Sequence, residues 1–395
     1  MSSSGRATGT PTGSGTLPSE PLPPAAGPGG EVRGEIVIGS VGNYSGIPGT
    51  FMSPGARAVQ AWVKWVNGKG GVNGHPVRYI VADDGSDPAR HQQLVQEFVE
   101  RRGVRAFVYN GYPLTGQASV RYLIEKRVPT IGSEGSGQWF NESPMHFAPF
   151  AHGHLLMESW LAGSAELLVP QDKKKLGFVA CQEVQFCHDA QAVWPGLASK
   201  VGFDLVYSAR VTLAQPSFTA ECLGARNAGV EFFYVVSDGN SLHRVARDCK
   251  SVGYTPTFGF PSTVIKNEDA TDPNVDGLVT TPPFMPWTAE GNPELDLFRD
   301  VITRFAPGIN PEGNPQAGWV SARVFEAAVG RSPDPTTSPG ILEGLWALKD
   351  ETVGGTANPL TFARDKPTPA PPCWSHLVVK GGAFASPTNN RLACR

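Results

Sequence analysis

The sequence predicts an α/β fold in two domains. Its 395 residues are enough for two domains of ordinary size, each able to bury its own core. Residues 34–84 alternate strand, loop, helix, turn and strand, which is the pattern of a βαβ unit. A second alternating series of helices and strands begins at His154. We therefore expect parallel sheets covered by helices.

The opening βαβ unit points to a ligand site. A buried strand is followed by a polar, glycine-rich loop over residues 42–46. A helix is predicted from about Ser53, with Pro54 tolerated in its first turn, where a missing N–H costs nothing. Ligands of such units lie beyond the carboxyl ends of the strands, near the helix N-terminus. We therefore expect Tyr44 and Ser45 to hold a small molecule.

The other elements follow from apolar periodicity and from the glycine, proline and asparagine residues that bound them. Strands are predicted at 77–82, 104–109, 128–131, 176–180, 205–211, 231–236, 257–260 and 375–380. Helices are predicted at 88–102, 154–168, 217–227, 242–252, 293–305, 316–329 and 339–347. Trp62, Trp65 and Trp160 stand at helical spacing among apolar residues, so we assign them to the core.

Three features of residues 34–84 resemble a known family. They are the loop with an aromatic residue and Ser-Gly, the helix that ends in Val-Asn-Gly-Lys-Gly-Gly-Val-Asn-Gly, and the strand that closes on Asp-Asp. In this order they resemble the type I periplasmic solute-binding proteins, in the leucine/isoleucine/valine-binding branch that feeds ABC transporters. The resemblance covers roughly 34–385, nearly all of the folded chain.

This resemblance implies two doubly wound parallel-sheet lobes joined by a three-segment hinge. Lobe 1 would contain residues 31–149 and 285–362, and lobe 2 would contain residues 150–284 and 363–395. A ligand would bind between the lobes and draw them together by hinge closure.

In the family, lobe 1 grips a ligand carboxylate with hydroxyl and backbone N–H groups from the loops after its third and fourth strands. Oriented N–H dipoles and hydroxyls can bind an anion without burying an opposing formal charge. The matching positions are Leu114, Thr115, Gly135 and Ser136. Tyr44 in the first loop would stack on the ligand or cover it.

In lobe 2 the resemblance implies contacts from Phe186 and from Asp238 or Gly239. The largest departure is Ser262, where the amino-acid binders place a glutamate that accepts hydrogen bonds from the ligand ammonium group. Serine cannot neutralise an ammonium, so a carboxylic acid, an aromatic acid or an amide fits at least as well as an α-amino acid, unless Asp238 or Glu183 supplies the charge. An apolar or aromatic ligand body is favoured by Tyr44, Tyr112, Trp139 and Phe186.

The cysteines indicate the compartment. They are even in number and none shows zinc-type spacing, which favours disulfides and an oxidising compartment over free thiols in the cytosol. Local pairs would join Cys181 to Cys187, Cys222 to Cys249 and Cys373 to Cys394, although sequence alone leaves the connectivity open.

Residues 1–30 consist mainly of Ser, Gly, Pro, Thr and Ala, a composition that cannot repay the entropy of ordering. We expect a disordered tether. These residues show no signal peptide. One interpretation is an extracytoplasmic lipoprotein whose signal is missing from this sequence, and the alternative is a cytoplasmic protein with this start.

Several function classes are disfavoured. The net charge of −3 with no strongly basic stretch argues against nucleic-acid partners. The chain has no dinucleotide fingerprint, no P-loop and no nucleophile elbow, and Glu134 has no histidine in sequence reach. We therefore expect no enzyme activity, no cofactor and no metal. The leading hypothesis is an extracytoplasmic solute-binding protein of an ABC importer. Its partners would be ABC permease subunits and a small ligand that bears a carboxylate or resembles an aromatic or branched-chain amino acid. A ligand-sensing regulator of the same fold is the alternative, followed by an enzyme.

Overall fold

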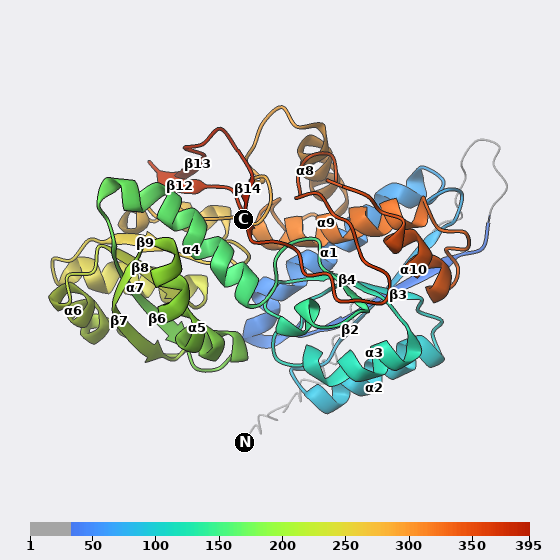
Figure 1. The fold of residues 1–395 in the computed structure, drawn as a ribbon, viewed down its shortest axis with the longest axis horizontal. Helices are drawn as coiled ribbons and strands as arrows, with labels where there is room; N and C mark the ends of the chain where they lie inside the picture. The colour runs from blue at the N-terminus through green and yellow to red at the C-terminus, as the bar shows by residue number, and fades with distance from the viewer. Residues whose placement is uncertain (1–32) are drawn as a thin grey trace, which may run out of the picture.

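The computed structural model describes residues 33–395, which form two lobes (Figure 1). The expected tether, residues 1–30, lies outside the described residues. The lobe 1 sheet is parallel and runs in the order β2-β1-β3-β4-β5. Its strands are β1 (Ile36–Gly42), β2 (Val77–Asp83), β3 (Ala106–Asn110), β4 (Thr130–Ser133) and β5 (His146–Phe147).

Helices cover both faces of this sheet. On one face α1 (Gly46–Gly68) packs against α9 (Gly313–Val329), with α8 (Pro293–Phe305) and α10 (Ser338–Trp346) beside them. The other face is covered by α2 (Pro88–Glu100) and α3 (Val120–Lys126). The C-terminal part of the chain therefore supplies half of the lobe 1 helical cover.

The first helix begins earlier than predicted. α1 starts at Gly46 and carries Pro54 in its interior, so the expected start near Ser53 is wrong. Because proline has no N–H, the Thr50 carbonyl lacks its usual hydrogen bond from residue 54. Thr50 is exposed, so water can bond this carbonyl instead. The helix therefore tolerates this proline. As a consequence, the first turns of α1 project from the carboxyl end of the sheet.

Lobe 2 is built on a second sheet, in the order β13-β12-β10-β9-β8-β6-β7, in which β12 and β13 are antiparallel to their neighbours. Its strands are β6 (Lys175–Cys181), β7 (Asp204–Val211), β8 (Phe232–Val236), β9 (Thr257–Gly259), β10 (Val279–Thr280), β12 (Leu377–Lys380) and β13 (Ala383–Ala385). Its helices are α4 (His154–Leu168), α5 (Gln185–Val201), α6 (Thr219–Asn227) and α7 (Gly239–Ser251). These two sheets confirm the predicted fold class.

The three local cysteine pairs that the sequence offers as possible are all present as disulfides. Cys181–Cys187 joins the end of β6 to α5, and Cys222–Cys249 joins α6 to α7. Cys373–Cys394 joins β11 (Cys373–Trp374) to β14 (Ala393–Cys394), a short ladder at the C-terminus.

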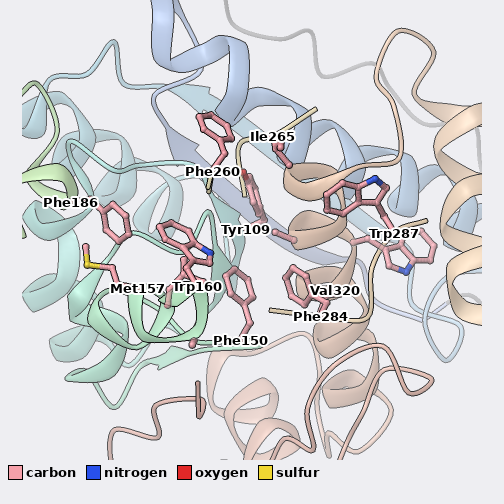
Figure 2. Packing of buried hydrophobic residues seen from close by; sticks show 14 of the residues in the cluster. Tyr109, Phe150, Met157, Trp160, Phe186, Phe260, Ile265, Phe284, Trp287 and Val320 are labelled. Carbon is pink, nitrogen blue, oxygen red and sulfur yellow. The ribbon is translucent and has the colours of Figure 1, made fainter. Parts of the chain in front are cut away.

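The chain passes between the lobes after β5, after β10 and after α10. Phe150 follows the first passage and Phe284 follows β10, and their rings pack edge to face with centroids 4.7 Å apart. Figure 2 shows both rings in the middle of an apolar cluster that extends into both lobes. Among the described residues, no helix combines the length and apolar character needed to cross a bilayer.

Candidate ligand-binding site

A cavity of about 310 Å³ lies between the lobes. Lobe 1 contributes the first turns of α1 and the loops after β3 and β4, through Ile47, Phe51, Met52, Pro113, Glu134 and Ser136. Lobe 2 contributes α4, the loops after β6 and β8, and the segment after β9, and its main contacts are Trp160, Val184, Phe186, Val236, Ser237 and Asp238. Both sheets therefore present the carboxyl ends of their strands to one cavity, as expected for open parallel sheets.

The lobe 2 wall is aromatic. The rings of Trp160 and Phe186 pack edge to face with centroids 5.6 Å apart (Figure 2). Trp160 Nε1 donates to the hydroxyl of Ser262 (3.2 Å), which donates to the carbonyl of Thr281 (3.1 Å). Ser262 is itself buried and does not line the cavity. At this position the serine orients a tryptophan that forms part of the wall.

The Cys181–Cys187 disulfide also lines the cavity. It closes the short loop that carries Val184 and Phe186, both of which face the cavity. Because the bridge ties the end of β6 to the first turn of α5, it restricts the positions that Phe186 can take.

Glu134 is the buried acid that lobe 1 contributes to this site. Its Oε2 accepts from the Tyr112 backbone N–H (3.2 Å), and its Oε1 accepts from the Ser136 N–H (3.3 Å) and from the Ser136 hydroxyl. Burial raises the pKa of this carboxyl above its ordinary value, although the hydrogen bonds oppose that effect. The carboxylate has neutral donors behind it and the cavity in front.

A second polar cluster lies in lobe 1 but does not line the cavity. The Thr115 hydroxyl donates to Asp84 Oδ2 (2.6 Å), and His91 Nδ1 lies 2.9 Å from the same oxygen. The Leu114 N–H donates to Asn43 Oδ1 (3.2 Å). Burial raises the pKa of Asp84, but hydrogen bonds from His91 and Thr115 outweigh it and hold the pKa below its ordinary value. Leu114 and Thr115 therefore direct their polar groups into the protein.

Four of the predicted ligand residues come together on the cavity: Ser136, Phe186 and both alternatives after β8, Asp238 and Gly239. Asp238 also caps α7, accepting from the Ser241 N–H (2.7 Å). Gly135 lies between two lining residues and adopts φ of 101°, and a Cβ there would lie 2.8 Å from Leu156 and 2.9 Å from Phe150. Gly135 therefore permits the close approach of the two lobes.

The other predicted positions lie elsewhere. The Tyr44 hydroxyl bonds the Ser40 hydroxyl (2.5 Å) and accepts from the Gly111 N–H (3.0 Å), so the ring folds back onto lobe 1. Ser45 is exposed and precedes α1 without a side-chain cap. Tyr112 is fully buried, and its ring packs edge to face on Trp139 with centroids 5.7 Å apart.

Sequence reasoning missed several lining residues. Ile47 and Phe51 were overlooked because the helix start was placed too late, and Trp160 was assigned to the core without a cavity. His243 at the rim lies 2.8 Å from both Asp269 and Asp272. The hydrogen bond to Asp269 is the main cause that raises the pKa of His243 to about 9. Within residues 33–395, no group of three or more His, Cys, Asp or Glu side chains is arranged so that it could hold a metal ion.

Comparison with known proteins agrees with this architecture. Residues 35–377 match the family model described as periplasmic binding protein. An amino acid binding protein of Pseudomonas aeruginosa is 21% identical over 325 residues, which cover 74% of this chain and 78% of that protein.

Solved structures share the fold. One is a branched chain amino acid ABC transporter protein from Thermus thermophilus with bound valine (TM-score 0.77, 18% identity, 90% of this chain and 95% of that chain). Another is an ABC transporter solute binding protein from R. palustris in complex with benzoate (TM-score 0.72, 15% identity, 89% and 95%). The family match spans most of the sequence and the fold agrees with it, so this chain belongs to the periplasmic binding protein family.

Proposed function

We propose that this chain is an extracytoplasmic solute-binding protein of an ABC importer and that it binds a small, largely apolar ligand between its lobes. The observation that carries the proposal is the cavity of about 310 Å³, to which each lobe contributes an apolar wall. This volume lies at the lower end of the range for small-molecule sites, and it is sufficient for an amino acid or a small aromatic compound. Burial of such a ligand against both lobes would stabilise the closed arrangement.

The walls support an apolar ligand body. Trp160, Phe186 and Val236 face the cavity from lobe 2, while Ile47 and Phe51 face it from lobe 1. Valine and benzoate, the ligands named for two structural relatives, have bodies of this kind. We propose that the ligand of this chain also has an apolar body. The polar residues of the site determine which head group it carries.

Polar groups for a head group are present on both sides. Glu134 and Ser136 face the cavity from lobe 1. From lobe 2 the Ser237 hydroxyl faces it, and this buried oxygen has no hydrogen-bond partner among the described residues. An unsatisfied buried hydroxyl costs free energy, which a bound ligand can recover.

The extracytoplasmic location is supported by the family match and by three disulfides, which form and persist in oxidising compartments. A tether formed by residues 1–30 and contact with ABC permease subunits complete the proposal.

A thermal-shift screen of the oxidised protein tests the proposed function. A ligand at 100 times its Kd stabilises the folded state by about 2.7 kcal/mol, which gives a clear rise in Tm. Mass spectrometry of the recovered ligand should show it chemically unchanged. Isoleucines in lobe 1 provide a matched control: Ile47 is 57% exposed at the cavity, whereas Ile124 is 36% exposed on α3. Ile47→Ala should weaken every hit and Ile124→Ala should weaken none; equal effects would contradict the proposed site.

A further inference from the structure

The head-group side of the cavity is dominated by an acceptor. Donors from two loops converge on the Glu134 carboxylate: the Tyr112 N–H after β3, and the Ser136 N–H and hydroxyl after β4. Every one of these partners is neutral. Glu134 is 3% exposed, so the little surface it retains faces the cavity. Within residues 33–395, Oε2 accepts one hydrogen bond, which leaves it able to accept another from a ligand.

Other donors from the same loops are also engaged within the protein. The Thr115 hydroxyl is bonded to Asp84, and the Leu114 N–H to Asn43. The Gly135 N–H donates to the Ser133 hydroxyl (3.1 Å). A ligand carboxylate would therefore find these three donors already bonded to acceptors of the chain.

The other charged residues on the cavity also favour a ligand that donates hydrogen bonds. Among the described lining residues, the cations are Lys266 and His243, and each already has an acidic partner. Lys266 Nζ lies 3.5 Å from Glu268, and His243 lies 2.8 Å from Asp269. Glu134 and Asp238, in contrast, have only neutral N–H and O–H partners. The unpaired charge in the cavity is negative.

We propose that the Glu134 carboxylate recognises a hydrogen-bond donor on the ligand, so that this site takes an apolar amine, amide or alcohol and rejects the corresponding carboxylate. The inference rests on the proposed function, because it assumes that the interlobe cavity binds a solute. Both named relatives bind carboxylates, valine and benzoate, so the proposal separates this chain from them. Two carboxylates in contact repel each other strongly enough to weaken binding by roughly 100-fold.

The test uses two matched series on the full oxidised chain. One compares valine with isobutylamine, which lacks only the carboxylate. The other compares benzoate with benzylamine, benzamide and benzyl alcohol. Calorimetric titration should show binding of at least one carboxylate-free compound, with the carboxylates weaker by roughly 100-fold.

Two substitutions at Glu134 sharpen the test. Glu134→Gln replaces an acceptor oxygen by a donor NH₂ and should weaken the amine by at least about tenfold. Glu134→Ser removes the carboxylate, frees the donors of Tyr112 and Ser136, and should gain measurable benzoate or valine binding. Glu158→Gln is the control, because Glu158 is similarly buried but bonds Lys200 (2.6 Å) away from the cavity. Circular dichroism checks that each variant is folded.

The outcomes separate the two proposals. If the wild type binds valine or benzoate as tightly as the carboxylate-free compounds, and Glu134→Gln leaves or improves that binding, the inference about Glu134 is overturned while the proposed function stands. If neither the wild type nor Glu134→Ser binds any compound of either series, the interlobe cavity is not a site for solutes of this size, and the proposed function falls with the inference.

Discussion

Two buried carboxyl groups of lobe 1, Asp84 and Glu134, occupy similar places in the fold and have opposite characters. Asp84 follows β2 and Glu134 follows β4 in the same parallel sheet. Asp84 is enclosed by His91, Thr115 and other polar groups, whereas Glu134 has neutral donors behind it and the cavity in front. The pKa of Asp84 is lowered and that of Glu134 is raised. A polar residue after a strand is thus structural or ligand-facing according to its partners.

Removal of Asp84 should have the largest effect on stability. Asp84→Ala leaves His91, Thr115 and Asn43 without their shared acceptor in a site with no exposed surface. Breaking a buried pair of this kind costs about 3–5 kcal/mol. Urea unfolding should show this loss, whereas Glu134→Gln should change the free energy of unfolding by less than about 1 kcal/mol. A loss below about 1 kcal/mol for Asp84→Ala would remove the contrast between the two acids.

Two disulfides of lobe 2 show the same contrast between a structural group and a group that faces the cavity, with smaller expected effects on stability. Cys222–Cys249 is fully buried away from the cavity and spans 27 residues, whereas Cys181–Cys187 lines the cavity and spans 6. Loop-closure entropy assigns about 3.5 kcal/mol to the first and about 2 kcal/mol to the second. Double alanine variants should show that order in urea unfolding. Only the Cys181/Cys187 variant should lose ligand affinity while folded, because its loop carries Phe186; equal affinities would contradict this role.

Substitution of Ile47 measures the apolar contribution of the cavity to binding. Ile47→Ala removes apolar surface that a ligand would cover, and the expected loss is about 1–2 kcal/mol, or roughly 5- to 30-fold in Kd. The free energy of unfolding should hardly change, because Ile47 is exposed in the free protein. Titration of one hit against this variant and Ile124→Ala checks the prediction. An unchanged Kd for Ile47→Ala would place the ligand elsewhere.

The pH dependence of stability should differ in sign between the two acids. The lowered pKa of Asp84 means that its stabilisation is present above its ordinary pKa of 3.8 and is lost as pH falls through the folded-state value. The raised pKa of Glu134 means that its contribution is largest below 4.5 and declines as pH rises above that value.

Substitution of each acid by its amide removes the titrating carboxyl group. The difference in unfolding free energy between the wild type and each variant, followed over pH, therefore isolates the contribution of that group. Between pH 3 and pH 7, the stability of the wild type relative to Asp84→Asn should rise, and that relative to Glu134→Gln should fall. Urea unfolding at a series of pH values measures both differences. Parallel slopes would show that the two carboxyl groups share one kind of environment.

The sequence predicted the fold class, and it offered the three local cysteine pairs without fixing their connectivity. Apolar periodicity predicted α8 at 293–305, as observed, and the three local cysteine pairs are those of the structure. The start of α1 was missed because Pro54 suggested a first turn, whereas the chain accepts a proline where the helix faces solvent. Apolar periodicity therefore predicts that a helix exists more reliably than proline predicts where the helix begins.

The site was less predictable because its geometry depends on contacts distant in sequence. Thr115 lies in the expected loop, but Asp84, 31 positions earlier, draws its hydroxyl inward. Ser262 is bonded to Trp160, 102 positions earlier, and does not reach the cavity. Periodicity identifies Trp160 as buried but does not distinguish a side chain packed in the core from one that walls a cavity between lobes.

A crystal structure with the tightest-binding compound of the two series tests the central claim most directly. The account predicts the apolar body against Trp160 and Phe186, and the donor atom of the head group within about 2.7–3.2 Å of a Glu134 carboxylate oxygen. A ligand bound outside the interlobe cavity would contradict the proposed function. A ligand carboxylate held by Ser136 and the Tyr112 N–H, with Glu134 turned away, would contradict the role assigned to Glu134.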